Sequence, residues 1–286
     1  MKVLVAGAGG MVGRHVAAYC VALGDDVFQY DRRGLDITAD DQVRHLLERD
    51  RPQAVINCAA WTDVDACEGD SQRAFEVNAR GPEILAMNCR RAGASLVTIS
   101  TDYVFDGKAK GFYDQRNDPS PISVYGEAKL EGERRAQRAC ARTTVVRSGF
   151  IFGRGGRNFL STVIDCGRRN GRLTAITDAF GTPTYAADLA RRLRQLAELD
   201  LPGIYHVTNQ GEGASYYQFA IAALAAASCD PGLVTPISAN DLKRPAPRPR
   251  NARLRCLLSE AIGLEPLPPL ADALREFARE TAAAGA

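Results

Sequence analysis

Short apolar runs alternate with longer amphipathic stretches through the first half of the chain. The apolar runs are typical of strands buried on both faces of a parallel sheet, and they lie at residues 2–6, 27–30, 54–57, 95–99 and 143–146. The stretches between them have helical spacing, from residue 11 to about 24, after residue 38, from about 71 to 92, and from residue 125 onward. Four strand–helix units in about 140 residues predict right-handed parallel crossovers, and therefore an α/β fold with a doubly wound parallel sheet.

The second half of the chain is less regular. A Gly-rich loop at 153–156 precedes a predicted helix near 158–170, short strands near 173–176 and 204–207, and a final helix near 270–283. We therefore expect residues 1–150 to form the sheet domain, with its sheet completed by parts of 180–210. Residues 151–286 are expected to form mainly a smaller, discontinuous lobe that closes over a substrate.

The first apolar run ends in the segment Gly7-Ala8-Gly9-Gly10-Met11-Val12-Gly13, directly before a helical stretch. Strand, glycine turn and helix in this order are the setting of a dinucleotide-binding fingerprint. Gly7 would permit the tight turn, Gly10 the approach of backbone to a pyrophosphate, and Gly13 close packing of helix on strand. The phosphates would bind at the helix N-terminus. A plain glycine-rich turn is the alternative.

The second apolar run ends in Asp31-Arg32-Arg33. An acidic residue at this point usually holds the ribose hydroxyls of NAD, whereas an arginine accommodates the 2′-phosphate of NADP. Because both kinds of residue are present, the sequence leaves the choice between NADPH and NADH open. Thr38, which ends the following phrase Leu35-Asp36-Ile37-Thr38, is predicted to be the N-cap of the next helix.

Two further strand ends carry small or polar residues. Cys58, Ala59 and Ala60 follow the third run, where they would let backbone lie close to a flat cofactor at the carboxyl end of a strand. Thr101 follows the fourth run, and its hydroxyl could hydrogen-bond a substrate carbonyl. An ordinary Ser/Thr strand terminus is the alternative.

Tyr125 and Lys129 begin the helical stretch that follows Pro119 and Pro121. Residues four apart lie on one face of a helix, so the phenol and the ammonium point the same way. We expect the ammonium to lower the pKa of the phenol from its usual value of about 10, which makes Tyr125 a candidate general acid. The spacing alone is weak evidence, and the case depends on the glycines and on Thr101.

Composition and charge narrow the range of partners. The 286 residues carry a formal net charge of +2, with 45% hydrophobic and 24% charged residues, as in an ordinary globular protein. We expect neither a nucleic-acid nor a membrane partner, because the charge is spread along the chain and no apolar run is long enough to span a bilayer. The eight cysteines form no Cys-x-x-Cys pair, so we expect no metal and a reduced, cytoplasmic setting.

Together these features resemble the extended short-chain dehydrogenase/reductase family, and within it the dTDP-4-dehydrorhamnose reductases. The resemblance runs almost from end to end. It rests on phrases in the same order and at matching separations: Leu35-Asp36-Ile37-Thr38, Ala59-Ala60-x-Thr62-x-Val64-Asp65 with Glu68, Val77-Asn78-Ala79, Ser100-Thr101-Asp102-Tyr103-Val104-Phe105-Asp106-Gly107, Val124-Tyr125-Gly126-Glu127-Ala128-Lys129, Asn158-Phe159, Phe180-Gly181-Thr182-Pro183-Thr184 and Arg248-Pro249-x-Asn251.

The resemblance implies a Rossmann-type NAD(P)-binding domain in residues 1–150 and a sugar-nucleotide-binding lobe mainly in 151–286. It implies reduction of the 4-keto group of a dTDP-4-keto-6-deoxy sugar nucleotide with NADPH or NADH, most closely dTDP-4-dehydrorhamnose to dTDP-L-rhamnose. Hydride would pass to C4 and Tyr125 would protonate the developing alkoxide. Lys129 would hold the nicotinamide ribose, and Thr101 would bind the keto oxygen.

The resemblance also implies two sets of binding residues. The cofactor set is Gly7, Gly9, Gly10, Met11, Val12, Gly13, Asp31, Arg32, Asp36, Ile37, Cys58, Ala59, Ala60, Thr62, Tyr125 and Lys129. The substrate set is Thr62, Val64, Thr101, Asp102, Tyr103, Phe150, Asn158, Thr182 and Arg248. The arginine would supply charge to the diphosphate.

Two positions depart from the family pattern. Phe150 stands where family members commonly carry a tryptophan over the sugar, which leaves the exact hexose open. His15 stands two residues after the third glycine, where some members have a glutamate that holds Mg²⁺ between two subunits. We therefore expect no metal, and the sequence leaves a homodimer open.

Other functions are weighed against this one. Dehydratases of the same family carry an acidic pair after the threonine, whereas here Tyr103 follows Asp102, which disfavours elimination of water. A sugar-nucleotide 4-epimerase, or a reductase of another 4-keto sugar, stays open. A non-catalytic NADP-binding module, similar to the regulatory subunit of methionine adenosyltransferase, is disfavoured by the intact set of Thr101, Tyr125 and Lys129.

Overall fold

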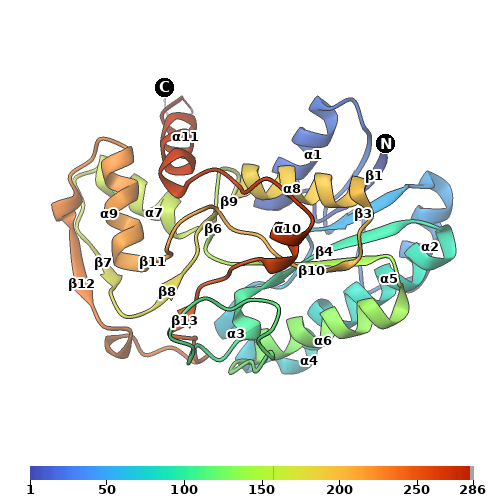
Figure 1. Ribbon diagram of the computed structural model, residues 1–286, viewed down its shortest axis with the longest axis horizontal. Coiled ribbons are helices and arrows are strands. Elements are labelled where there is room, and N and C mark those ends of the chain that lie inside the picture. Colours follow the sequence, from blue (N-terminus) through green and yellow to red (C-terminus); the bar gives the residue numbers. More distant parts are fainter. Residues whose placement is uncertain (157, 284–286) are drawn as a thin grey trace.

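The computed structural model describes residues 1–156 and 158–283. Its centre is a six-stranded parallel sheet with the strand order β10-β5-β4-β3-β1-β2 (Figure 1). The strands are β1 (Lys2–Ala6), β2 (Asp26–Tyr30), β3 (Ala54–Asn57), β4 (Ser95–Thr101), β5 (Thr143–Ser148) and β10 (Gly203–His206). The chain reverses its direction of travel across the sheet between β1 and β3, where sheets of this kind bind ligands. The doubly wound α/β fold predicted from the sequence is confirmed.

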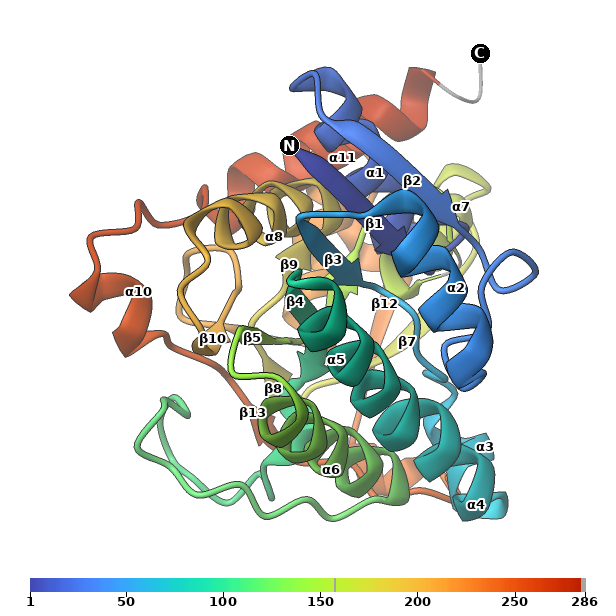
Figure 2. The same ribbon diagram turned by 90° about the vertical axis from the view of Figure 1, so that its right-hand side faces the viewer.

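Helices cover both faces of this sheet (Figures 1 and 2). One face packs against α1 (Met11–Ala22) and α8 (Ala186–Leu199), and the other against α2 (Asp40–Asp50), α5 (Gly81–Ala92) and α6 (Val124–Ala139). Within β1, Val3 and Val5 pack into the hydrophobic core on the side of α1 and α8. Leu4 packs into the core on the opposite side, formed with α2, α5 and α6. Alternate residues of β1 are therefore buried on opposite faces, which explains its continuous apolar run. In the described ranges, no helix is long and apolar enough to cross a membrane.

Two local predictions on this side of the chain are wrong. The predicted helix at 71–92 is divided into α4 (Ser71–Phe75), a π-helical turn at Glu76–Arg80, and α5. Thr38 does not cap α2, because that helix begins at Asp40 after Ala39 and has no side-chain cap. The Thr38 hydroxyl instead donates to Asp36 Oδ1 at 2.8 Å. A short Asx-type turn has thus replaced the predicted cap.

The rest of the second half forms a smaller lobe beside the sheet, on the left in Figure 1. Its helices are α7 (Phe159–Arg168), α9 (Tyr216–Ala226) and α11 (Leu270–Ala283). Its short strands pair as β7 (Leu173–Ile176) with β12 (Val234–Ile237), β6 (Ile151–Phe152) with β9 (Thr184–Tyr185), and β8 (Phe180–Gly181) with both β11 (Ala214–Ser215) and β13 (Asn251–Ala252). The lobe has its own core, which includes Phe152, Leu160 and Phe219. The segments α3 (Val64–Gly69) and α10 (Leu257–Ala261) complete the chain.

Candidate active site

The glycine-rich turn joins β1 to α1 with little room for side chains. Gly7 has φ +77°, and a Cβ there would lie 2.7 Å from the backbone N of Ala59. A Cβ on Gly13 would lie 2.2 Å from the carbonyl oxygen of Gly7. The N-cap of α1 is Gly10, which has no side-chain cap, and the first turn contains no acidic residue. Its first N–H groups are therefore left for an anion, and the turn fits a pyrophosphate.

A cavity of about 1010 Å³ opens beside this turn, along the carboxyl ends of β1, β2 and β3. Asp31 and Asp36 border it, but both carboxylates hold turns: Asp31 Oδ1 accepts the N–H of Gly34 at 3.0 Å, and Asp36 accepts from Thr38. Arg32 borders the same cavity with an exposed side chain. The predicted cofactor residues that line this outer cavity are Gly7, Gly9, Gly10, Asp31, Arg32, Asp36, Ile37, Cys58, Ala59 and Ala60.

Two residues that line the outer cavity, Trp61 and Arg73, were not among the predicted site residues. The Arg73 guanidinium lies 4.4 Å from the centroid of the Trp61 ring, and both residues line the cavity. The buried Asn78 fixes the Trp61 backbone, because its amide accepts the Trp61 N–H and donates to the Trp61 carbonyl, each at 2.9 Å. The family phrase Val77-Asn78-Ala79 was visible in the sequence, but its spacing does not indicate which segment Asn78 holds.

An inner cavity of about 520 Å³ adjoins the outer one. Gly10, Cys58, Ala59 and Ala60 border both cavities, so the two are neighbours along one wall. The predicted residues that line the inner cavity are Gly10, Met11, Val12, Cys58, Ala59, Ala60, Thr62, Val64, Thr101, Asp102, Tyr103, Tyr125, Lys129, Phe150 and Asn158. The structure therefore brings most of the two predicted sets together.

Besides Arg248, which is described below, two predicted site residues border neither cavity. Gly13 is used for packing, because it lies directly against the Gly7 carbonyl. Thr182 is buried, and its hydroxyl accepts the N–H of Leu254 at 3.1 Å. For these two, the sequence phrase marks a position that shapes the backbone rather than the cavity wall.

The helix α6 carries Tyr125 and Lys129 into the inner cavity. It begins after Ser123, whose hydroxyl accepts the N–H of Gly126 at 3.2 Å. A Cβ on Gly126 would lie 2.3 Å from the Tyr103 carbonyl oxygen, and a Cβ on Gly132 would lie 2.1 Å from that of Asn78. These glycines let the helix lie close to its neighbours, so both Tyr125 and Lys129 are buried.

The charge relation expected between Lys129 and Tyr125 is wrong in this arrangement. Burial raises the pKa of Tyr125 above its usual value, a hydrogen bond with Thr101 lowers it, and the charge of Asp102 raises it. The Lys129 ammonium is not among the groups that shift the pKa of Tyr125. It donates instead to the Ile99 carbonyl at 2.7 Å. Burial lowers the pKa of Lys129 itself to about 8, against the opposing charge of Glu133.

A buried ion pair lies one helical turn beyond Lys129. Arg147 Nη2 lies 2.7 Å from Glu133 Oε2, and Arg147 Nε lies 3.0 Å from Glu133 Oε1. The Ser100 hydroxyl donates to Glu133 at 2.5 Å. Because Ser100 is on β4 and Arg147 on β5, this network attaches α6 to two strands and fixes the position of Lys129.

Thr101 and Asp102 form the end of β4 and the start of a 3₁₀ turn at Asp102–Val104. The Thr101 hydroxyl donates to Asp102 Oδ1 at 3.0 Å and accepts the Tyr103 N–H at 3.2 Å. Asp102 is 2% exposed, and its Oδ2 is buried without a hydrogen-bond partner among the described residues. Burial raises the pKa of Asp102 to about 7.

Aromatic side chains close the lobe side of the inner cavity. Phe150 has φ 46° and stacks on Tyr216, with ring centroids 4.3 Å apart. Tyr103 meets Tyr125 edge to face at 6.0 Å. Tyr216 was missed because the Leu and Ala spacing of 216–227 predicts a core helix. That prediction holds for the buried residues Phe219, Ala220, Ala223 and Leu224, while the first residue of α9 lines the cavity.

Arg248 lies behind this aromatic wall rather than in the inner cavity. It borders a small cavity of about 30 Å³, together with Tyr103, Phe150 and Arg244. Its guanidinium binds both carboxylate oxygens of Asp65, at 2.5 and 2.8 Å, and holds the pKa of that carboxyl down at about 2. The positive charge of Arg248, which was expected to bind a diphosphate, is thus partly neutralised by the Asp65 carboxylate.

Comparison with known proteins identifies the family. Residues 1–283 match the family described as RmlD substrate binding domain. The chain belongs to this family. A dTDP-4-dehydrorhamnose reductase of Streptomyces griseus is 39% identical over 279 residues, which are 96% of this chain and 91% of that protein. The family resemblance inferred from the sequence phrases is confirmed.

Two further proteins are similar to this chain over most of their length. The probable dTDP-4,6-dihydroxy-2-methyloxan-3-one 4-ketoreductase of Streptomyces antibioticus is 37% identical over 278 residues, 96% of this chain and 94% of that protein. The crystal structure of dTDP-4-dehydrorhamnose reductase from Bacillus anthracis in complex with NADP superposes with a TM-score of 0.93. It is 32% identical and covers 98% of this chain and 100% of that chain.

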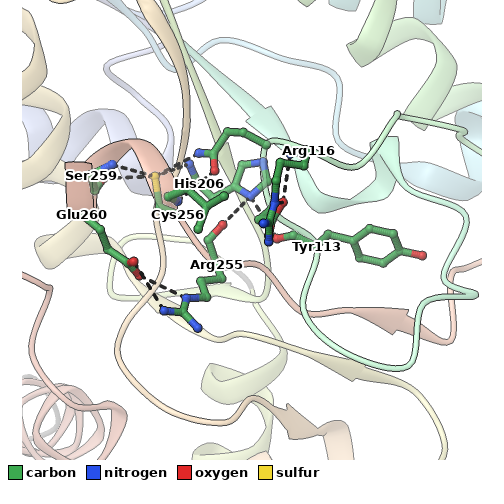
Figure 3. Close-up of polar contacts among 10 residues, drawn as sticks. Tyr113, Arg116, His206, Arg255, Cys256, Ser259 and Glu260 are labelled. Carbon is green, nitrogen blue, oxygen red and sulfur yellow. Dashed lines mark hydrogen bonds and ion pairs between the residues drawn. The ribbon is translucent and has the colours of Figure 1, made fainter. Parts of the chain in front are cut away.

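In this member of the RmlD substrate binding domain family, His206 lies in a separate polar cluster. It lies in the strand predicted near 204–207 and is only 3% exposed. Its Nδ1 lies 2.9 Å from the Arg255 carbonyl and 3.2 Å from that of Tyr113 (Figure 3). Nearby, Cys256 Sγ accepts the Gln115 amide at 3.1 Å. The cluster joins β10 to two loops, and it borders neither of the two cavities above.

Proposed function

We propose that this protein is an NAD(P)H-dependent oxidoreductase that reduces the 4-keto group of a dTDP-4-keto-6-deoxyhexose. The specific reaction proposed is dTDP-4-dehydrorhamnose to dTDP-L-rhamnose. The observation that carries the proposal is the meeting of Thr101, Tyr125 and Lys129 in a cavity next to the glycine turn. The names of the two Streptomyces relatives support the substrate class. The cytoplasmic location, and the homodimer that the sequence leaves open, stay predictions.

The glycine turn and the outer cavity fit a nicotinamide dinucleotide. The N–H groups at the start of α1 would hold the pyrophosphate, and Asp31 and Arg32 would face the adenosine ribose. Residues 58–60 would form the wall between the two cavities. The NADP in the related Bacillus anthracis structure supports this choice of cofactor. When bound, the reduced nicotinamide supplies the hydride.

The side chains of this protein supply the proton and orient the sugar. Burial keeps Tyr125 protonated at neutral pH, the form that a general acid requires, and the alkoxide that develops at C4 is more basic than a phenolate. Lys129, on the same face of α6, would hold the nicotinamide ribose. We assign the sugar side to Thr62, Val64 and Asn158, which border the inner cavity.

Tyr125→Phe tests this assignment, because it removes one hydroxyl and leaves the ring. Oxidation of NADPH and of NADH is followed with dTDP-4-keto-6-deoxy-L-mannose generated in place by the upstream enzymes. We expect kcat to fall by about 10²- to 10⁴-fold, the usual contribution of a positioned acid, with cofactor binding retained. Tyr19→Phe makes the same chemical change on α1, away from both cavities, and serves as the control.

The outcomes separate the candidate functions. Full activity in Tyr125→Phe would contradict the proposed acid. Cofactor binding without oxidation would exclude this substrate and direct the assay to the 4-keto sugar in the name of the Streptomyces antibioticus relative. Interconversion of sugar nucleotides without net oxidation of the cofactor would indicate an epimerase. Binding with no turnover of any of these sugars would indicate a regulatory module.

A further inference from the structure

The Asp102 carboxyl lies directly behind the hydroxyl of Thr101. Its Oδ1 is 3.0 Å from Thr101 Oγ1, and its Oδ2 is buried against the backbone of Gly149, where a Cβ would come within 2.2 Å of it. The carboxyl forms no ion pair with the described residues, and its Oδ2 has no hydrogen-bond partner among them. An ionised carboxylate left in this state is costly, so the site favours the neutral acid.

Hydrogen-bond counting at Thr101 links Asp102 to Tyr125. A threonine hydroxyl has one proton to donate and two lone pairs that accept. The Tyr103 N–H occupies one lone pair. If Asp102 is ionised, the single Thr101 proton must point to Asp102, and it is then not available to form a hydrogen bond to Tyr125. If Asp102 is protonated, it donates to the second lone pair, and the Thr101 proton is free to point at the Tyr125 oxygen.

The charges around Asp102 act in the same direction. The titratable groups that face it are the phenols of Tyr103 on its own turn, Tyr125 from α6 and Tyr216 from α9. The negative charge of Asp102 raises the pKa of Tyr125. Protonation of Asp102 removes that charge and makes the phenol a better acid. With its own pKa raised to about 7 by burial, Asp102 holds its proton in a large share of molecules at neutral pH.

Asp106, four residues further along, shows what an aspartate does when it only shapes this turn. Its Oδ1 accepts the Lys108 N–H at 3.0 Å and the Tyr113 hydroxyl at 2.8 Å. The N–H of Lys108 and the other donors lower its pKa below the usual value. Asp102 also accepts hydrogen bonds, from the Thr101 hydroxyl and from backbone N–H groups, but burial outweighs them and raises its pKa. Shaping the turn does not by itself explain this opposite shift.

We propose that Asp102 is the proton source that recharges Tyr125 through the Thr101 hydroxyl. The inference rests on the proposed reduction, in which Tyr125 gives its proton to the alkoxide and becomes a phenolate. Thr101 then passes its hydroxyl proton to the phenolate oxygen and receives the proton of Asp102 in the same movement. One O–H bond breaks and one forms at Thr101, Asp102 ends as a carboxylate, and water reprotonates it before the next turnover. No electrons are transferred in this relay.

Asp102→Asn tests the relay, because the amide keeps the shape and neutrality of the protonated acid but has no proton to release. In wild type, kcat should be highest below pH 7 and fall by roughly tenfold per unit above it, as the acid form disappears. In Asp102→Asn, kcat should be roughly tenfold lower at pH 6 and change little through pH 7, with KM preserved. Asp106→Asn makes the same substitution in the same turn, and it should keep the wild-type profile.

A second measurement does not depend on turnover. Infrared spectra of the full chain without cofactor or sugar should contain the C=O stretch of a protonated carboxylic acid, which disappears as pH is raised through about 7. This band should be present in Asp106→Asn and absent in Asp102→Asn. The result identifies the protonation state of Asp102 whether or not the proposed substrate is correct.

The outcomes distinguish this inference from the proposed function. If wild type reduces the sugar but Asp102→Asn keeps the inflection near pH 7, the relay is overturned and the reductase stands. A missing infrared band in wild type also overturns the relay. A fall in kcat near pH 8 that is common to all variants is explained by Lys129, whose pKa is about 8, and is not evidence for Asp102. If no variant oxidises the cofactor but the band titrates, the proposed function fails while the protonated Asp102 stands.

Discussion

Arg32 and Asp31 lie next to one another at the end of β2, but they are engaged differently. Asp31 Oδ1 accepts the backbone N–H groups of Arg33 and Gly34, each at 3.0 Å, so one of its two carboxylate oxygens is engaged by the turn. Arg32 is exposed on the rim of the outer cavity. The sequence could not decide between NADPH and NADH because it shows both residues and not their partners. The observed contacts favour an arginine free to bind a 2′-phosphate.

Arg32→Ala should therefore weaken the use of NADPH more than that of NADH. The two cofactors differ only in the 2′-phosphate, and a hydrogen bond to a charged group contributes about 1.5–3 kcal/mol, or roughly 10- to 100-fold in binding. KM for each cofactor, measured with saturating sugar, checks this. Arg44→Ala, at an exposed arginine of α2 paired with Asp41, is the control. An equal rise in both KM values would show that Arg32 does not contact the phosphate.

At the scale of elements, the sequence predicted the strands and helices that hydrophobic periodicity determines. It missed the features that depend on contacts between distant parts of the chain. The six strands of the central sheet and the last helix, α11, were predicted to within about two residues because both faces of the sheet and one face of the helix are buried. Most of the short strands of the lobe were not predicted. The π-helical turn at Glu76–Arg80 was missed, since it serves to bring Asn78 to the Trp61 backbone. Tyr216 and Arg73 were missed for the same reason: their places on the cavity walls depend on elements distant in sequence.

The edge strand β10 depends on a histidine that must stay neutral. Both partners of His206 Nδ1 are carbonyl oxygens, so Nδ1 carries the proton, and Nε2 is buried without a partner among the described residues. Burial lowers the pKa of His206 to about 4, and the charge of Arg147 adds to this. The unfolded chain takes up the proton near pH 6.5, whereas the folded chain takes it up only near pH 4.

Stability should therefore be fully present above pH 6.5 and be lost as pH falls toward 4. For a difference of about 2.5 pKa units, the His206 share of the free energy of unfolding is about 3 kcal/mol. Urea denaturation between pH 7 and 4 measures it. His206→Gln should lose stability over this range less steeply than wild type, while His45→Gln, on the exposed side of α2, should follow wild type. Identical slopes for all three proteins would contradict the assignment.

At the scale of the whole molecule, the candidate site lies between the two halves of the chain. Tyr125 and Lys129 belong to α6, which packs on the sheet, whereas Asn158 and Tyr216 begin α7 and α9 of the lobe. Figure 1 shows these helices on the two sides of the molecule. Such a cleft must bury groups that a stable core would exclude. Lys129 is the clearest case, because it is 4% exposed and its ammonium is held by the carbonyl of Ile99. The proposed function of Lys129 and the stability of the fold therefore make opposite demands at this position.

Lys129→Met should raise stability and abolish reduction. Burial lowers the pKa of Lys129 to about 8, compared with 10.5 for an ordinary lysine, so the folded state carries the cost of the charge at pH 7. After the loss of one hydrogen bond is subtracted, we expect the free energy of unfolding to rise by about 1–3 kcal/mol. As pH rises from 8 toward 10.5, folded wild type releases the proton before the unfolded chain does, so the advantage of the variant should shrink.

Urea denaturation at pH 7 and pH 10 checks both the gain and its pH dependence. Lys108→Met, at an exposed lysine, controls for the general effect of replacing a charge by a thioether. A variant less stable than wild type at pH 7 would mean that the Ile99 hydrogen bond and the attraction of Glu133 outweigh the cost of burial. Lys129 would then be a stabilising residue, and its place in the cleft could not be read as a demand of catalysis.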